Sequence, residues 1–311
     1  MENYSLVSRV GIRRVIIWGL RNPFHSHHFI HLGFYTTLKK IRFPVKWLED
    51  ISSSNDCLVT GDLIITADIC MKNLLPHKNV FFCLHNPISD FVEKLDYGSY
   101  FFLQVLTKHV YQEFCMKKNA ELSGLAFFDY ASLVLYQSWG TPMLPYEFKA
   151  PRYLEYKKIE FFVGSIWNND QNQGNELAIQ EYKDALSTLG IKFKQIRGCP
   201  EIYNSLFVRH AALATAIVGD WQKTHGYTPC RLFKALSYGR LASINSISSK
   251  EQYPWIFSNN SIRDLTLSQY KINKKEYIEL VSNQQQFLKS ETYLSKLSNI
   301  FYVFELVKGL K

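Results

Sequence analysis

Long apolar runs are missing from this sequence of 311 residues. Nowhere do about 18 apolar residues follow one another, as a helix that crosses a bilayer requires. The opening MENYSLVSRVGIRR also lacks the apolar segment of a signal peptide. Charge is scarce too, at 20% of residues against 47% apolar ones, which excludes an intrinsically disordered chain. We therefore expect a folded, cytoplasmic protein.

Several chemical signatures are absent as well. The six cysteines form no C-x-x-C pair, so we expect reduced thiols and no metal site. No G-x-G-x-x-G follows the first apolar run, which excludes a dehydrogenase of the dinucleotide-binding type. The excess of 36 Lys and Arg over 27 Asp and Glu is spread along the chain without a basic stripe. We expect no nucleic-acid partner, while the net charge is compatible with a weak membrane-surface association.

Apolar runs of strand length alternate with segments of helical spacing along the whole chain. This alternation is typical of a parallel sheet covered by helices, an α/β fold. The main expected strands and helices are, in order, residues 13–20, 25–41, 62–68, 79–86, 132–140, 158–167, 174–190 and 212–220.

One segment interrupts the alternation. Residues 140–158 contain three prolines and no helical period, which predicts a domain boundary. We expect two Rossmann-like, doubly wound domains, over 1–148 and 149–311, because the length suits two domains of about 150 residues each. Amphipathic helices within 274–311 are expected to pack back on the first domain. Ligands of such sheets bind at the carboxyl ends of strands and between domains.

The stretch GYTPCRLFKALSYGRLASINS, residues 226–246, reads as a loop, a short helix over 229–238 and an apolar strand. Thr228 and Arg231 stand at the start of the helix, where backbone N–H groups favour anions. The stretch resembles the donor-site motif of exostosin-like glycosyltransferases, which have the GT-B fold. The matching residues are Arg231, Leu232, Phe233, Ala235, Leu236 and Gly239. Lys234 departs from the motif, since the family carries an acid there that contacts the ribose of the nucleotide.

The resemblance implies two domains facing a cleft and an inverting transferase that moves a sugar, most simply from a UDP-sugar, to a glycan or glycolipid hydroxyl. The nucleotide sugar is a substrate, and no further cofactor is expected. Because the chain has no Asp-x-Asp, the diphosphate must be met by cationic side chains, hydroxyls and a helix start, without a metal. The expected donor-binding residues are Gly164, Ser165, Arg197, Asp220, His225, Tyr227, Thr228, Arg231 and Lys234.

The loop after the first strand, residues 19–31, holds four of the nine histidines. A histidine titrates near neutral pH and can remove the proton of an acceptor hydroxyl. His27 and His31 have the spacing of two metal ligands on a helix, but no third ligand follows in the sequence. The candidates for the catalytic base are His25, His27, His28, Asp68 and Asp90, and those for acceptor binding are Arg21, Asn22 and His85.

Two other interpretations remain open. A nucleotide-sugar epimerase can share the two-domain plan, although it needs more carboxylates in the cleft than the sequence offers. A non-catalytic protein that binds polyanions or a membrane surface would use the net charge of +9 alone.

Overall fold

The computed structural model describes residues 11–22, 26–49, 57–67, 74–85, 89–96, 98–104, 122–123, 128–129, 134–136 and 139–309. These residues form two compact units. Unit 1 takes the described residues before 138 together with the C-terminal helix that begins at Tyr293, and unit 2 is Trp139–Thr292.

The division between the units falls after residue 138, before the proline-rich segment, where the sequence prediction put it after residue 148. The segment stays with unit 2 because its backbone is bonded there. Lys149 donates its N–H to the Ser237 carbonyl at 2.9 Å, and Arg152 donates to the Gly239 carbonyl at 2.8 Å. Gly239 has φ +81°, and a Cβ on it would overlap the Ala150 carbonyl.

Within its described residues, unit 1 is built on one sheet of eight strands in the order β2-β1-β3-β4-β5-β8-β7-β6. Strands β1 to β5 and β8 pair in parallel, and β7 and β6 add an antiparallel edge. Because β2 and β3 lie on opposite sides of β1, the parallel part has the order of a doubly wound sheet. The strands are β1 (Arg14–Trp18), β2 (Val45–Leu48), β3 (Asp62–Ala67), β4 (Phe81–His85), β5 (Tyr100–Gln104), β6 (Leu122–Ser123), β7 (Phe128–Asp129) and β8 (Val134–Tyr136).

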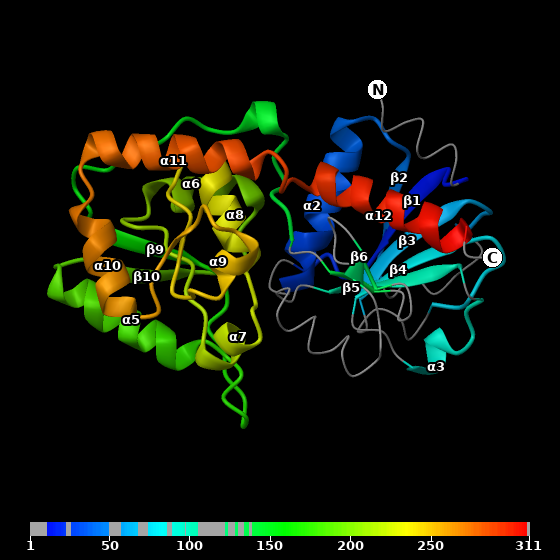
Figure 1. Ribbon diagram of the computed structural model, residues 1–311, viewed down its shortest axis with the longest axis horizontal. Coiled ribbons are helices and arrows are strands. Elements are labelled where there is room, and N and C mark those ends of the chain that lie inside the picture. The colour runs from blue at the N-terminus through cyan, green and yellow to red at the C-terminus, as the bar shows by residue number, and fades with distance from the viewer. Residues whose placement is uncertain are drawn as a thin grey trace. The chain divides into compact units, whose positions relative to one another are not determined.

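Helices cover both faces of this sheet. Phe81 of β4 packs against Phe304 of α12, with ring centroids 5.3 Å apart, and α12 lies beside α2 on that face (Figure 1). Phe82 faces the other way and packs against Phe91 of α3 at 5.4 Å. Of the two C-terminal helices only α12 therefore joins the core of unit 1, and α11 stays with unit 2. The helices are α2 (Ser26–Lys40), α3 (Ser89–Val92) and α12 (Tyr293–Gly309).

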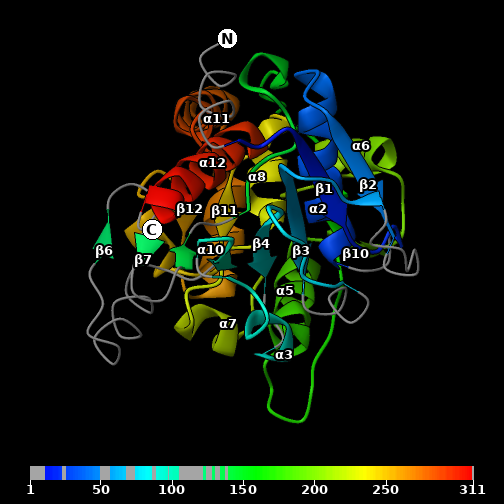
Figure 2. The ribbon, with the colours of Figure 1, turned by 90° about the vertical axis from the view of Figure 1, so that its right-hand side faces the viewer.

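Unit 2 has two short parallel pairs, β9 with β10 and β11 with β12. Phe162 of β9 contributes to a core with α5 and α10, while Phe161 faces the other way and packs against Phe207 of α6 at 5.2 Å. The loop between β9 and α5 projects from the unit beside α7 (Figures 1 and 2). The elements are η3 (a 3₁₀ turn, Pro145–Glu147), β9 (Ile159–Val163), α5 (Glu176–Thr188), β10 (Lys192–Ile196), α6 (Glu201–His210), α7 (Asp220–Thr224), α8 (Cys230–Ser237), β11 (Ser243–Ile244), α9 (Ser249–Gln252), β12 (Phe257–Ser258), α10 (Ile262–Lys271) and α11 (Lys274–Leu288).

The expected strand over 212–220 is only a bridge in the structure. Ala216 pairs with Ile244 of β11, and α7 already begins at Asp220. The reason is a kink at Ala214, which has φ +62°. The buried Glu160 carboxylate accepts the N–H of Ala214 at 3.1 Å in place of a neighbouring strand, so the ladder is interrupted there.

Candidate functional site

Helix α8 begins at Cys230 without a side chain that caps its first turn. Its N-cap is Pro229, whose ring offers no acceptor. The first backbone N–H groups of a helix have no partner within the helix, and the helix dipole adds positive potential at this end. The start of α8 is therefore suited to an anion.

Arg231 lies on this first turn and is half-buried. Its guanidinium carbon stands 4.4 Å from the ring centroid of Phe162 in β9. The Nη1 atom is buried, and none of the described residues accepts a hydrogen bond from it. Burial lowers the pKa of Arg231, against opposing effects of Tyr227 and Cys230, yet a guanidinium stays charged in proteins. Since a buried cationic donor without an acceptor is costly, an anion at this place would relieve that cost.

Gly164, directly after β9, brings the backbone next to this guanidinium. Its φ of +156° is one that side chains rarely adopt, and a Cβ there would lie 3.4 Å from Arg231 Nη1. Gly164 donates its N–H to the Ile196 carbonyl at 3.1 Å and accepts from Gln195 Nε2 at 2.9 Å. The carboxyl ends of β9 and β10 are therefore tied together at the point where Arg231 approaches them.

A chain of hydroxyl groups runs beside the start of α8. Thr228 donates to Ser249 Oγ at 3.4 Å, and Ser249 donates to Ser246 Oγ at 3.3 Å. The chain continues to Ser248 at 2.9 Å and ends on the Lys223 carbonyl at 3.0 Å. Thr228, Ser246 and Ser249 are buried. Hydroxyl groups can rotate to donate or accept, so this chain can adapt to a phosphate oxygen.

Lys234, one turn along α8, is engaged in an ion pair. Its Nζ lies 3.0 Å from Glu201 Oε2, and Tyr238 donates its hydroxyl to Glu201 Oε1. Burial acts to lower the pKa of Lys234, but the Glu201 carboxylate outweighs it and the net shift is upward. Glu201, at the start of α6, thus brings a carboxylate next to Lys234, the position at which the motif itself carries an acid.

Other predicted donor residues lie around this cluster. Tyr227 is partly buried, and burial raises the pKa of its hydroxyl to about 12. The Ser165 carbonyl accepts a hydrogen bond from Asn175 Nδ2 at 3.2 Å. Arg197 is exposed directly after β10. Of these three, only Tyr227 interacts electrostatically with Arg231.

Asp220 and His225 lie at the two ends of the short helix α7. Asp220 is exposed and forms an ion pair with Lys223 at 2.9 Å. The His225 ring stacks on Trp221, with centroids 4.0 Å apart, and its Nδ1 lies 2.8 Å from the Trp221 carbonyl. The structure gives both residues local partners within α7.

In unit 1 the predicted residues Arg21 and His28 gather around Trp47 of β2. Arg21 Nη2 donates to the Trp47 carbonyl at 2.7 Å, and its guanidinium stands 5.4 Å from the indole. The rings of His28 and His31 lie 5.5 and 6.3 Å from the same indole. His31 is buried and fills the space at Gly19, where a Cβ would overlap its ring. The contacts of His28 and His31 with Trp47 are packing contacts, whereas Arg21 is bonded to the Trp47 carbonyl.

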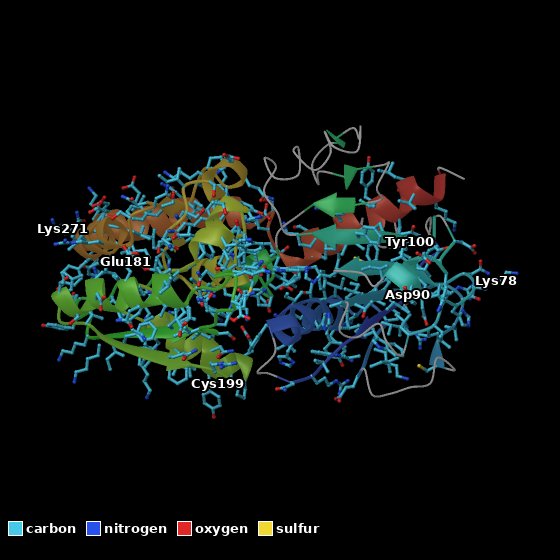
Figure 3. All side chains as sticks on the ribbon, turned by 90° about the horizontal axis from the view of Figure 1, so that it is seen from below. Lys78, Asp90, Tyr100, Glu181, Cys199 and Lys271 are labelled. Carbon is cyan, nitrogen blue, oxygen red and sulfur yellow. The ribbon has the colours of Figure 1, made fainter. Side chains whose placement is uncertain are left out.

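The remaining candidates of unit 1 are further apart. Asn22 is exposed beyond the end of β1, and His85 ends β4 in a half-buried position. Asp90 is exposed in α3, on the same side of the unit as Lys78 and Tyr100 (Figure 3). His25 and Asp68 lie outside the described residues, as does the side chain of His27.

Sequence reasoning did not single out Glu201, Ser246 or Ser249 for the site. The serines had a usable signal, because the run SINSISS follows an apolar strand at its carboxyl end. Glu201 had none, since an ion pair between α6 and α8 depends on how the two helices pack.

No family model matches the chain, and no curated protein matches its sequence. Among solved structures it is similar to the N-terminal domain of Candida albicans trehalose-6-phosphate phosphatase, with 10% identity, a TM-score of 0.53 and coverage of 95% of this chain and 97% of that one. It is also similar to T4 phage β-glucosyltransferase, with 8% identity, a TM-score of 0.48 and coverage of 94% and 99%. At such identities the first likeness concerns the fold alone. The second has the lower TM-score, and neither fold nor function is inferred from it.

The chain is therefore an α/β protein with parallel sheets covered by helices. Neither likeness tests the similarity of residues 226–246 to the exostosin-like motif, which stays a prediction. Among the described residues no helix is long and apolar enough to cross a membrane.

Proposed function

We propose that this chain is an inverting, metal-independent glycosyltransferase of the GT-B type, built of two Rossmann-like units and using a UDP-sugar as the donor. The observation that carries the proposal is the buried Nη1 of Arg231, which has no acceptor among the described residues and lies at the uncapped start of α8. A diphosphate supplies the acceptor oxygens that this group lacks.

The proposed diphosphate site combines four kinds of group. Arg231 gives the positive charge, the first N–H groups of α8 add the helix dipole, and Gly164 leaves room for close approach of a phosphate oxygen. Thr228 and the serine hydroxyls behind it complete the shell. Donors fixed in this way stabilise the charge that develops on the leaving group without a metal ion.

The ribose is assigned to a group other than residue 234. A lysine cannot accept a hydrogen bond from a ribose hydroxyl. The carboxylate of Glu201, held by Lys234 and Tyr238, lies within 3.0 Å of the lysine nitrogen and can accept instead. An acid from another helix thus takes over the role that the resembling family gives to an acid at position 234.

Unit 1 has the acceptor role in this proposal. The acceptor oxygen attacks the anomeric carbon as the bond to the diphosphate oxygen breaks, and this displacement inverts the configuration. The proton of the acceptor hydroxyl passes to a base. The candidate bases remain His25, His27, His28, Asp68 and Asp90, with Arg21, Asn22 and His85 as acceptor-binding groups.

Nucleotide binding with EDTA present tests the donor site. We expect UDP, but not GDP, CMP or ADP, to raise the melting temperature. The shift should be large enough to measure, because a ligand at 100 times its Kd stabilises the protein by about 2.7 kcal/mol. The Arg231→Gln variant should lose the shift. Arg263→Gln, which removes an exposed arginine of α10, is the matched control and should keep it.

The absence of any nucleotide-dependent shift in the unmodified protein would overturn the proposal in favour of polyanion binding. Product analysis distinguishes a glycosyltransferase from a nucleotide-sugar epimerase. A transferase releases UDP in the presence of an acceptor, whereas an epimerase converts the nucleotide sugar without releasing UDP.

A further inference from the structure

Helix α6 exposes an apolar stripe. Ile202, Tyr203 and Leu206 have 69%, 54% and 48% of their surface exposed. The three residues are one and four positions apart, so they lie on neighbouring turns of one side of the helix. Leu and Ile side chains that are this exposed contribute little to the core. Cys199 marks the loop that leads into this helix (Figure 3).

The sheet that α6 covers carries lysines on the same face. Ile159 of β9 is 38% exposed on the face that α6 covers. Its parallel partner in β10 is Lys192, and the partner of Phe161 is Lys194. Phe193 between the two lysines packs on Phe162, on the opposite face, at 5.9 Å. Because successive side chains of a strand alternate, both lysines emerge on the face of α6.

Negative charge is almost absent from this surface. The carboxylates in β9, β10 and α6 are Glu160 and Glu201. Glu160 is buried and accepts the N–H groups of Leu213 and Ala214, while Glu201 is bonded to Lys234 and Tyr238. At the far end of α6, Arg209 and His210 add cationic or neutral groups but no acid.

We propose that this surface, formed by Ile159, Ile202, Tyr203 and Leu206 with Lys192 and Lys194 beside them, docks on an anionic lipid bilayer. An exposed apolar stripe flanked by cations suits the boundary between acyl chains and anionic headgroups, where apolar side chains enter and lysines stay with the phosphates. The charge complementarity favours a bilayer over a second copy of this chain, which would bring the lysines of both copies together. The surface uses none of the residues around Arg231, so either proposal can fail without the other.

Flotation with vesicles tests the docking. We expect the protein to bind vesicles of equal parts phosphatidylcholine and phosphatidylglycerol, to bind pure phosphatidylcholine vesicles far less, and to dissociate as salt is raised. The double variant Ile202→Ser with Leu206→Ser should bind at least about tenfold more weakly. Leu177→Ser is its matched control, because Leu177 is 70% exposed on α5, and it should bind like the unmodified protein.

A second pair of variants separates this surface from the overall charge. Lys192→Gln with Lys194→Gln should weaken binding to the anionic vesicles about 25-fold, from about fivefold per lysine. Lys274→Gln with Lys275→Gln removes the same charge from α11 and should have a much smaller effect. Equal losses in the two double variants would overturn the proposal, as would a lack of preference for anionic vesicles. A dimer in solution that the Ile202 and Leu206 changes dissociate would identify a second copy as the occupant instead.

Discussion

The two ends of helix α8 each hold an arginine, fully buried at position 240 and half-buried at position 231, and the two arginines have different partners. Arg240, just beyond the C-terminal end, is 1% exposed and donates to the carbonyls of Arg152, Ala211 and Ala212 at 2.8, 2.7 and 3.0 Å. Arg231, at the N-terminal end, has a buried Nη1 with no acceptor among the described residues. The Nε atom of Arg240 also lacks an acceptor among the described residues. The two arginines therefore differ at their terminal nitrogens, since Nη1 and Nη2 of Arg240 are bonded to carbonyls and Nη1 of Arg231 is left for a ligand.

Helix polarity explains the difference. The C-terminal end of a helix carries unpaired carbonyls and partial negative charge, which guanidinium groups satisfy. Arg209 does this for α8, donating to the Tyr238 carbonyl at 2.6 Å, and Arg240 does it for α6, whose C-cap residue Ala211 is one of its acceptors. At the N-terminal end the helix offers only N–H groups, so a cation there finds no backbone acceptor. Arg231 therefore adds to the positive potential of the helix start.

The largest expected effect is the loss of Arg240 at the C-terminal end of α8. Arg240→Met should lower the free energy of unfolding by about 4 kcal/mol, because three buried carbonyls lose a charged donor. Urea unfolding measures the change. Arg231→Met is the matched variant, and it should leave stability unchanged or raise it slightly, since it removes an unsatisfied buried donor.

If both arginine variants destabilised the protein equally, Arg231 would be a structural residue and the donor site would have to lie elsewhere. If Arg240→Met cost nothing, the carbonyls of Ala211 and Ala212 would have other donors available. Circular dichroism of the folded variants confirms that each measurement starts from an intact fold.

A smaller effect is expected at Gly164, which lies beside Arg231 at the N-terminal end of α8. Gly164→Ala should destabilise by about 1 kcal/mol, because φ +156° is strained for alanine. It should also weaken UDP binding about tenfold, since the new methyl group takes the space beside Arg231 Nη1. Gly190→Ala is the control for strain alone, because Gly190 also has positive φ but nothing lies within 4 Å of its Cβ position. Isothermal titration should find UDP binding unchanged in that control.

Local sequence signals predicted much of unit 2. The pattern around Arg231 predicted the start of α8, and the spacing of apolar residues predicted α5, because these depend on neighbours along the chain. The strand expected over 212–220 was wrong in extent. The kink at Ala214 is held by Glu160, a residue from a different strand, and no local pattern reports such a contact.

The candidate site likewise combines residues that local sequence signals indicate with contacts that they do not indicate. Gly164, Thr228 and Arg231 could be predicted, since each lies next to a strand end or a helix start. The ion pair of Lys234 with Glu201 could not, because it joins two helices. In unit 1 the histidines were chosen for their place after the first strand and for their chemistry. The structure gives His28 and His31 packing contacts with Trp47, which sequence reasoning had no means of detecting.

The smallest expected effect concerns Lys157, which interacts with Arg240 beyond the C-terminal end of α8. Its Nζ donates to the Tyr270 carbonyl at 2.7 Å and lies over the rings of Tyr153 and Tyr270. Burial, with repulsion from Arg240, lowers the pKa of Lys157 to about 8 from its ordinary 10.5. Between these two pH values the unfolded chain binds more protons than the folded one, so stability should rise with pH. We expect a rise of about 1 kcal/mol, because solvent screens this partly exposed group.

Urea unfolding across that pH range measures the rise. Lys157→Met should remove it, because no proton is then released from this position in the folded state. Lys158→Met, which changes the exposed neighbour, should keep it. In Arg240→Met the rise should be reduced, because the repulsion that lowers the pKa of Lys157 is gone. A rise that persists unchanged in Lys157→Met would show that Lys157 is not its source, and the buried tyrosines could not supply it, because their raised pKa values make stability fall as pH rises.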